Sequence, residues 1–174
     1  MRPAVGTDQS NSAITDGFRY LLILSRPRFW LYLAGPVVVG VAAAATTVPD
    51  LFLPVGFALF GYFLLPANIL LYGVNDIFDA DIDTENPKKT EREARWQGGP
   101  VVIASVVASG LLAVPLFAIT GSVAWPWIAG FLLLAVGYSA PPARFKTTPP
   151  LDSLSNGLYI LPGIAAYAAV AGTQ

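Results

Sequence analysis

The amino-acid sequence predicts an all-α fold: a polytopic transmembrane helical bundle of about five spans, with a cytoplasmic N-terminus. Two observations predict it. First, hydrophobic residues make up 55% of the 174 residues and charged residues only 12%, whereas an average soluble domain has about 25% charged residues. Second, the apolar residues gather in long uncharged runs. We expect residues 1–174 to form a single membrane domain in which 1–18 are a polar tail.

Four runs without a charged residue supply the spans, and they cover 29–49, 51–75, 96–143 and 153–174. About 20 helical residues cross a hydrocarbon core. The third run is long enough for two helices, and Thr120-Gly121-Ser122 near its middle predicts the turn between them. We therefore expect spans near 29–47, 52–75, 100–119, 124–140 and 152–171. A cleaved signal peptide is disfavoured, because a long polar segment precedes the first run.

All ten Lys and Arg residues fall on one side of this five-span arrangement. They precede the first span, or they lie between the second and third spans or between the fourth and fifth. By the positive-inside rule, the N-terminus is then cytoplasmic and the C-terminus lies outside. We expect a multi-pass protein of the cell membrane whose polar motifs all lie at the cytoplasmic face.

The residue inventory restricts the chemistry of these 174 residues. The chain has no cysteine and no histidine, which excludes disulfides, thiolate or imidazole metal ligands and Ser-His catalysis within it. The formal net charge of −1 gives no electrostatic case for nucleic acid as a partner. Any chemistry here depends on carboxylates, arginines and lysines.

An acidic motif ends the second span, with the sequence Asn75-Asp76-Ile77-Phe78-Asp79-Ala80-Asp81-Ile82-Asp83. At about 100° per residue, Asn75, Asp76, Asp79 and Asp83 share one helix face, and Asp81 lies on the other side. Neighbouring carboxylates at the membrane are costly, so we expect a cation between them. Mg²⁺ prefers oxygen ligands and is often shared with substrate phosphates. Asp76, Asp79 and Asp83 are therefore predicted Mg²⁺ ligands; the alternative is a solvated acidic helix end.

Basic residues flank this motif in two other segments. Arg144 and Lys146, in a proline-rich loop before the fifth span, would reach a diphosphate, or would serve only as topology anchors. Arg26, in Ser25-Arg26-Pro27, would line a cavity mouth or extend to the headgroups. Asp152 is expected to cap the fifth span.

These motifs together resemble those of the UbiA-type intramembrane prenyltransferases. The acidic motif resembles the first aspartate-rich motif of that family, and Ser25-Arg26-Pro27 and Tyr138-Ser-x-Pro-Pro-x-Arg144-x-Lys146 fit the same family. Within it, the chain is most similar to the carotenoid branch, the lycopene elongases. A quinone or geranylgeranylglyceryl phosphate prenyltransferase is the alternative. The family has nine spans and a second aspartate-rich motif, so the chain looks like the N-terminal part of such an enzyme.

The resemblance implies Mg²⁺-dependent transfer of a prenyl group from a prenyl diphosphate to a lipophilic acceptor in the bilayer, such as lycopene. It implies catalytic roles for Asp76, Asp79 and Asp83, and substrate-binding roles for Asn75, Arg144, Lys146, Tyr138 and Arg26. The faces of Tyr72, Phe78 and Tyr138 would stabilise a carbocation.

The resemblance also implies that spans after the fifth supply the cavity wall opposite the acidic motif. We therefore expect the acidic stripe to be partly unpaired in this chain, and the chain alone not to turn over substrate. Two alternatives of other classes remain: a non-catalytic membrane fragment, and a cation-handling membrane protein. Against the second, transporters usually place ionisable groups at the bilayer midplane rather than at one end of a span.

Overall fold

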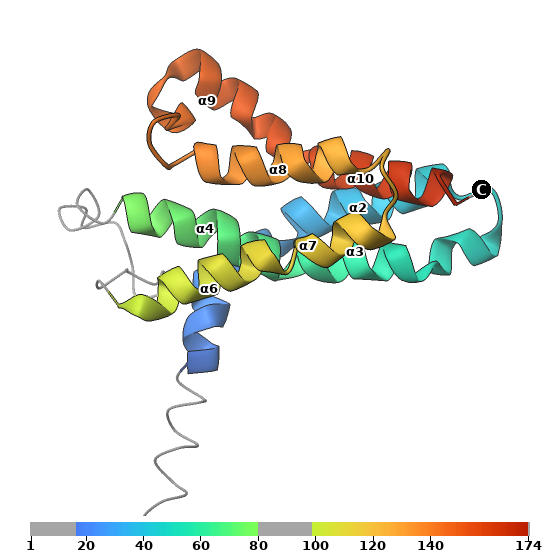
Figure 1. Cartoon of the computed structure of the whole chain (residues 1–174), viewed down its shortest axis with the longest axis horizontal. Coiled ribbons are helices and arrows are strands. Elements are labelled where there is room, and N and C mark those ends of the chain that lie inside the picture. Colours follow the sequence, from blue (N-terminus) through green and yellow to red (C-terminus); the bar gives the residue numbers. More distant parts are fainter. Residues whose placement is uncertain (1–16, 80–98, 174) are drawn as a thin grey trace, which may run out of the picture.

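The computed structural model describes residues 17–79 and 99–173, and in these ranges the chain is helical with no strand. A helix over 17–24 is followed by the elements shown in Figure 1. In chain order they are η1 (Pro27–Phe29), α2 (Trp30–Ala44), η2 (Val48–Phe52), α3 (Pro54–Leu64), α4 (Pro66–Phe78), α6 (Pro100–Leu111), α7 (Val114–Ile119), α8 (Trp125–Gly137), η3 (Phe145–Thr147), α9 (Pro149–Ser155), η4 (Asn156–Tyr159) and α10 (Leu161–Ala171).

Four helical segments of the described residues are long and apolar enough to cross a membrane. They are Pro27–Ala44, Val48–Phe78, Pro100–Ile119 and Pro149–Ala171, and each overlaps a predicted span. The remaining predicted span contains α8, an apolar helix of 13 residues, which is shorter than the roughly 20 residues that a perpendicular crossing needs. The prediction of an all-α polytopic membrane bundle is confirmed.

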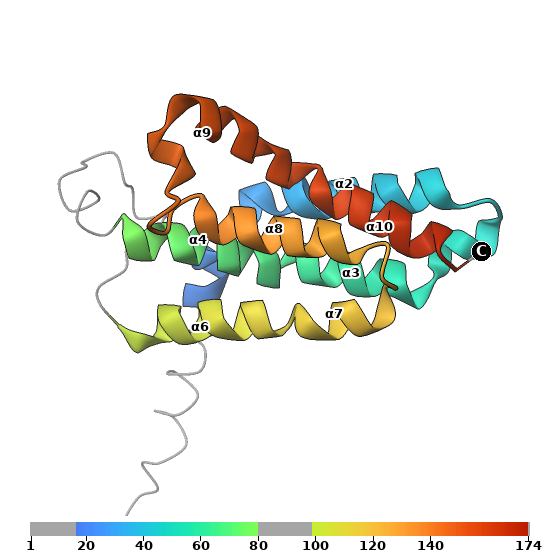
Figure 2. The same cartoon turned by 45° about the horizontal axis from the view of Figure 1, so that its top comes forward.

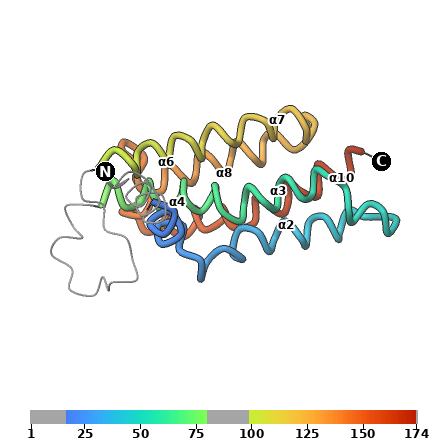
Figure 3. The backbone as a smooth tube through the Cα atoms, turned by 90° about the horizontal axis from the view of Figure 1, so that it is seen from below, coloured from blue at the N-terminus to red at the C-terminus, as the bar shows by residue number. Residues whose placement is uncertain are grey.

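The long helices run along one axis, as the tube in Figure 3 shows from below, and they enclose an apolar core. Buried side chains of α2, α3, α4, α8 and α10 form this core. Phe63 of α3 meets Phe131 of α8 edge to face, with ring centroids 5.0 Å apart, a geometry that aromatic pairs favour. The helix over 17–24 lies across the bundle rather than along it (Figure 1).

Helices α2 and α10 cross at a contact between backbones. A Cβ atom placed on Gly40 would lie only 2.0 Å from the carbonyl oxygen of Gly163, and one on Gly163 would lie 2.8 Å from that of Pro36. Small residues at such crossings let membrane helices approach closely and gain dispersion energy without a hydrophobic driving force. This pair of glycines therefore sets the distance between α2 and α10.

The second predicted span is broken at Pro66, which begins α4 directly after α3 ends. Pro66 has no N–H, so carbonyls in the preceding turn lose a donor. The buried side chain of Asn68 serves two other carbonyls at this break: Asn68 Nδ2 donates to the carbonyl oxygens of Phe63 (2.9 Å) and Leu64 (3.0 Å). The donor to the carbonyls before the break thus comes from the next turn of the same span.

One end of the bundle gathers the polar motifs. The helix over 17–24, the C-terminal end of α4 and the connection from α8 to α9 lie at this end, and the C-terminus lies at the other (Figure 2). Arg26 precedes η1 and the Arg144–Lys146 loop precedes α9, so these basic groups meet the end of α4. The fold thus joins segments 50 and 71 residues apart in sequence.

The α2–α10 crossing gives a test of the fold. We expect Gly40→Ala to destabilise the bundle by about 1–3 kcal/mol, because the new methyl group forces the backbones apart. Gly35→Ala, on the same helix, is the matched control: no atom lies within 4 Å of the position that its new Cβ would occupy, and alanine favours helix. Thermal or SDS unfolding in detergent measures both variants. Equal stability of the two would contradict the close crossing.

Candidate active site

The first cluster at the polar end joins Asp76 of α4 to Arg26. Arg26 Nη2 donates to Asp76 Oδ1 at 2.9 Å, and the Asp76 side chain is only 2% exposed. The guanidinium also lies over the ring of Tyr72, 4.7 Å from its centroid. A buried carboxylate requires a partner of opposite charge, and Arg26 provides both the charge and a planar contact with α4.

The turn before α2 holds Arg26 in place. Arg26 has a left-handed backbone, with φ 50° and ψ 73°, and stands at the N-cap of η1. The preceding residue, Ser25, is fully buried; its Oγ donates to the Leu22 carbonyl at 2.8 Å and accepts from Trp30 Nε1 at 3.0 Å. These hydrogen bonds stabilise a backbone conformation that residues with a Cβ seldom adopt.

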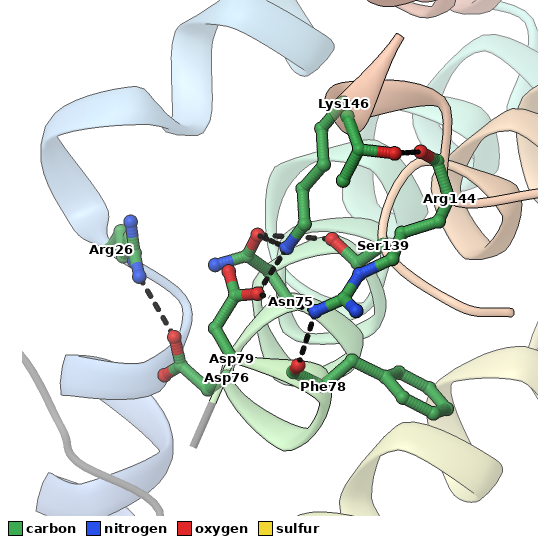
Figure 4. Close-up of polar contacts among 9 residues, drawn as sticks. Arg26, Asn75, Asp76, Phe78, Asp79, Ser139, Arg144 and Lys146 are labelled. Carbon is green, nitrogen blue, oxygen red and sulfur yellow. Dashed lines mark hydrogen bonds and ion pairs between the residues drawn. The ribbon is translucent and has the colours of Figure 1, made fainter. Parts of the chain in front are cut away.

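The second cluster lies around Asp79, the C-cap of α4. Lys146 Nζ forms an ion pair with Asp79 Oδ1, and Arg144 Nη2 lies 3.7 Å from the same oxygen. Arg144 Nη2 also donates to the Phe78 carbonyl at 3.1 Å. Figure 4 shows both basic side chains reaching from the proline-rich loop to the end of α4. Arg144, like Arg26, has a left-handed backbone, with φ 39°.

Asn75 lies between the two clusters and is bound by the second. Its Oδ1 accepts hydrogen bonds from Ser139 Oγ at 3.0 Å and from Lys146 Nζ at 3.3 Å. Ser139 is almost fully buried just after α8. One amide group therefore connects α4, the end of α8 and the basic loop.

A cavity of about 500 Å³ opens beside these clusters. Its polar lining includes Arg26, Asn75, Tyr138 and Asn156, and the rest is apolar or aromatic: Phe29, Tyr32, Leu71, Tyr72, Leu158 and Tyr159. Neighbouring rings form a continuous wall, with centroids 5.6 Å apart for Phe29–Tyr32, 5.7 Å for Phe29–Tyr72 and 6.1 Å for Tyr32–Tyr159. Such a cavity accommodates an apolar chain with a charged group at one end.

Tyr138 lines the cavity, and the Asp152 carboxylate lies nearby. Burial, and then the charge of Asp76, raise the pKa of the Tyr20 phenol. The expected cap by Asp152 is wrong: Thr148 is the N-cap of α9, and Asp152 lies within its first turn. The carboxylate instead contacts the loop that leaves α8.

The structure brings together seven of the eight residues predicted for the site, and Asp83 lies outside the described residues. Within the described part of the acidic stripe, Arg26 neutralises Asp76 and Lys146 neutralises Asp79, so the expectation of a partly unpaired stripe stays a prediction that depends on Asp83. Of the three predicted aromatic groups, Tyr72 and Tyr138 line the cavity, whereas Phe78 is exposed and points away from Asn75 (Figure 4). Sequence reasoning missed Ser139, although it stands next to Tyr138 in the same motif, and it missed the Ser25–Trp30 hydrogen bond.

The donor chemistry of this site fits a hard divalent cation. Asp76 and Asp79 offer carboxylate oxygens, and their ion pairs use Oδ1 of each. In the described part of the chain no three acidic, histidine or cysteine side chains gather closely enough to hold a metal. A metal held by these two carboxylates would therefore complete its coordination with other oxygens, as Mg²⁺ does with water and phosphate.

The Arg26–Asp76 pair gives a second test. Arg26→Gln removes the cation beside a buried carboxylate, and we expect a loss of about 3 kcal/mol of stability. Adding Asp76→Asn should recover part of that loss, which a double-mutant cycle of unfolding free energies measures. The control is Arg28→Gln, because Arg28 is exposed and its guanidinium lies over Phe29. Additive effects of the two site variants would rule out the coupling.

The chain is similar in sequence to several known proteins. The chain is 66% identical over 166 residues to a lycopene elongase/hydratase of Haloferax volcanii, a match that covers 95% of this chain and 55% of the relative. It is 60% identical to one of Halobacterium salinarum (90% and 57%) and 30% identical to one of Corynebacterium glutamicum (91% and 55%). The chain thus spans a little more than half the length of these curated relatives. No solved structure matches it.

The family itself is settled by a match over most of the chain. Residues 33–174 match the UbiA prenyltransferase family, and this range contains the acidic motif, the basic loop and most of the cavity lining. The chain therefore belongs to the UbiA prenyltransferase family.

Proposed function

We propose that this chain supplies the first substrate site of a membrane prenyltransferase, which transfers a prenyl group from a prenyl diphosphate to a carotenoid such as lycopene. The observation that carries the proposal is the junction of a charged cluster with an aromatic cavity. Arg26 and Asn75 contact the charged groups around the end of α4 and also line the cavity. A prenyl diphosphate has the same two parts, a charged head and an apolar chain.

The diphosphate head would bind at the ends of α4 and the basic loop. Lys146, Arg144 and Arg26 supply charge-assisted donors around Asn75 and Asp79, and Arg144 Nε is a buried donor with no acceptor among the described residues. Asp76 and Asp79, with Asp83, would hold Mg²⁺, which would neutralise the charge of the diphosphate. On binding, Lys146 and Arg26 would change partners from a carboxylate oxygen to a phosphate oxygen. No side chain would then be left as a buried unpaired charge.

The basic side chains would promote departure of the diphosphate. As the bond from carbon to oxygen breaks, negative charge grows on the leaving group and positive charge on the allylic carbon. Lys146 and Arg144 would stabilise the negative charge on the leaving diphosphate, because preorganised donors are most effective where water is excluded. The ring faces of Tyr72 and Tyr138 would stabilise the positive charge on the allylic carbon. The aromatic wall from Phe29 to Tyr159 would keep water from the cation until an alkene carbon of the acceptor attacks it. The new carbon–carbon bond leaves a cation on the acceptor, which becomes neutral by losing a proton.

The acceptor assignment depends on the relatives. Proteins that share 58–66% identity with this chain carry the name lycopene elongase/hydratase, and most of the residues that line the cavity are apolar or aromatic. A polyene hydrocarbon fits this lining, and it would enter the cavity from the bilayer.

Asp79 provides the test of this function. In the protein at its natural length, we expect Asp79→Asn to lower product formation from a prenyl diphosphate, lycopene and Mg²⁺ by at least about 100-fold. Mass spectrometry of extracted carotenoids measures the product. Asp50→Asn is the control, because Asp50 lies at the opposite end of the second span, bonded to Thr46 and Thr47. Full activity of the Asp79 variant would refute the proposed site.

We also propose that the polar end faces the cytoplasm. The connection from α8 to α9 and the C-terminal end of α4 lie at one end of the bundle, and the C-terminus lies at the other (Figure 1). Arg26, Arg144 and Lys146 all contact that end of α4. A reporter fused after Gln174 should therefore work only if it is active outside the cytoplasm. A cytoplasmic reporter that is active at this position would reverse the orientation.

A further inference from the structure

The reaction proposed above ends with the loss of a proton, which needs a group to accept it. The chain has no histidine, so a carboxylate is the natural acceptor. The described residues include four carboxylates, and three of them are engaged. Asp76 and Asp79 form ion pairs with basic groups, and Asp50 bonds the backbone at the opposite end of the second span. The fourth carboxylate is that of Asp152.

Asp152 lies beside the cavity and forms no ion pair with any residue that the structure describes. It is half-buried in α9, one turn before Asn156, which lines the cavity. Asn156 Nδ2 donates to the Asp152 carbonyl at 3.2 Å, and Ser155 Oγ donates to the same oxygen at 2.7 Å. Residues four apart on a helix share a face, so Asp152 lies on the side of α9 that borders the cavity.

The phenol of Tyr138 connects this carboxylate to the cavity. Tyr138 lines the cavity, and the charge of Asp152 acts on its hydroxyl. The backbone of Tyr138 is held in place, because its carbonyl accepts from the Lys146 N–H at 3.2 Å. A phenol can both donate and accept a hydrogen bond. Tyr138 can therefore take a proton from the cavity while it passes its own proton to the carboxylate.

We propose that Tyr138 and Asp152 form the relay that removes this proton. The proposal rests on the proposed function. After the acceptor alkene attacks the allylic carbon, the positive charge lies on a carbon of the acceptor. A hydrogen on the next carbon leaves as a proton, and its bonding electron pair becomes the new double bond. The Tyr138 oxygen receives this proton while the phenol proton moves to Asp152, which is half-buried and passes it to water.

The competing proton acceptor is the diphosphate that has just left. Its oxygens would be paired with Lys146 and Arg144, and nearby positive charge lowers the affinity of an oxygen for a proton. Asp152 has no such cation among the described residues. The two acceptors are distinguished by replacing Asp152, because that change has no effect on turnover if the diphosphate takes the proton.

The first experiment uses the protein at its natural length with a prenyl diphosphate, lycopene and Mg²⁺. We expect Asp152→Asn to lower product formation about 100-fold, a typical contribution of general-base catalysis. Calorimetry with inorganic diphosphate and Mg²⁺ should show equal or tighter binding, because the variant removes a negative charge near the anion. Asp50→Asn, the same exchange at the far end of the bundle, should change neither. Product formation within about threefold of wild type, or weaker diphosphate binding, would overturn the proposal.

The second experiment separates the hydroxyl of Tyr138 from its ring. Tyr138→Phe keeps the ring face and removes only the group that carries the proton. We expect product formation to fall at least about 10-fold, and the double variant with Asp152→Asn to be no slower than Asp152→Asn alone. Tyr167→Phe, on the exposed side of α10, is the matched control and should keep full activity.

The outcomes of the second experiment are distinct. A wild-type rate for Tyr138→Phe, or losses that add in the double variant, would overturn the relay. If the wild-type protein forms no prenylated carotenoid at all, the proposed function itself fails.

Discussion

Neutralisation of the carboxylates at the C-terminal end of α4 is the constraint on which the polar end of this bundle depends. Asp76 is buried and Asp79 is the C-cap of the helix. The C-terminus of a helix already carries a partial negative charge from its carbonyls, so the helix itself disfavours both carboxylates. Basic groups must come from elsewhere, and the fold delivers Arg26 from the turn before α2 and Lys146 from the loop after α8.

This constraint explains why the loops are built as they are. Arg26 and Lys146 are separated from their partners by 50 and 67 residues, so each ion pair closes a long section of chain. Pairs of this kind contribute little net stability when they are well formed, but loss of one member is costly. Their effect is therefore to fix where two segments lie against α4. The charges at the end of α4 are neutralised in only one position of the turn at Ser25–Arg26 and of the loop from Tyr138 to Lys146.

The sequence was sufficient for the helices and for seven described residues that the fold brings together at the polar end, but not for the pairings among them. Hydrophobic runs located the spans because span length follows from bilayer thickness, and the regular spacing of Asn75, Asp76 and Asp79 indicated a shared face. It could not show that Asp76 binds Arg26 while Asp79 binds Lys146, because these contacts depend on how the loops return to α4. Ser139 was not predicted, because a serine beside an apolar helix gives no charge or periodicity signal. The end of α8 was not predicted either, because α8 is shorter than the uncharged run that contains it.

The left-handed backbones of Arg26 and Arg144 have a consequence for how this protein would respond to selection for stability. An L-residue at such φ values costs about 1 kcal/mol relative to glycine, and both arginines stand there, at the starts of η1 and η3. Selection for thermal stability alone would therefore favour glycine at these two positions, because glycine adopts this backbone without strain. The same two positions carry the guanidinium groups that face the carboxylates of α4. Stability and charge make opposite demands at these positions, so a thermostabilised form should take its substitutions from the apolar bundle and keep both arginines fixed.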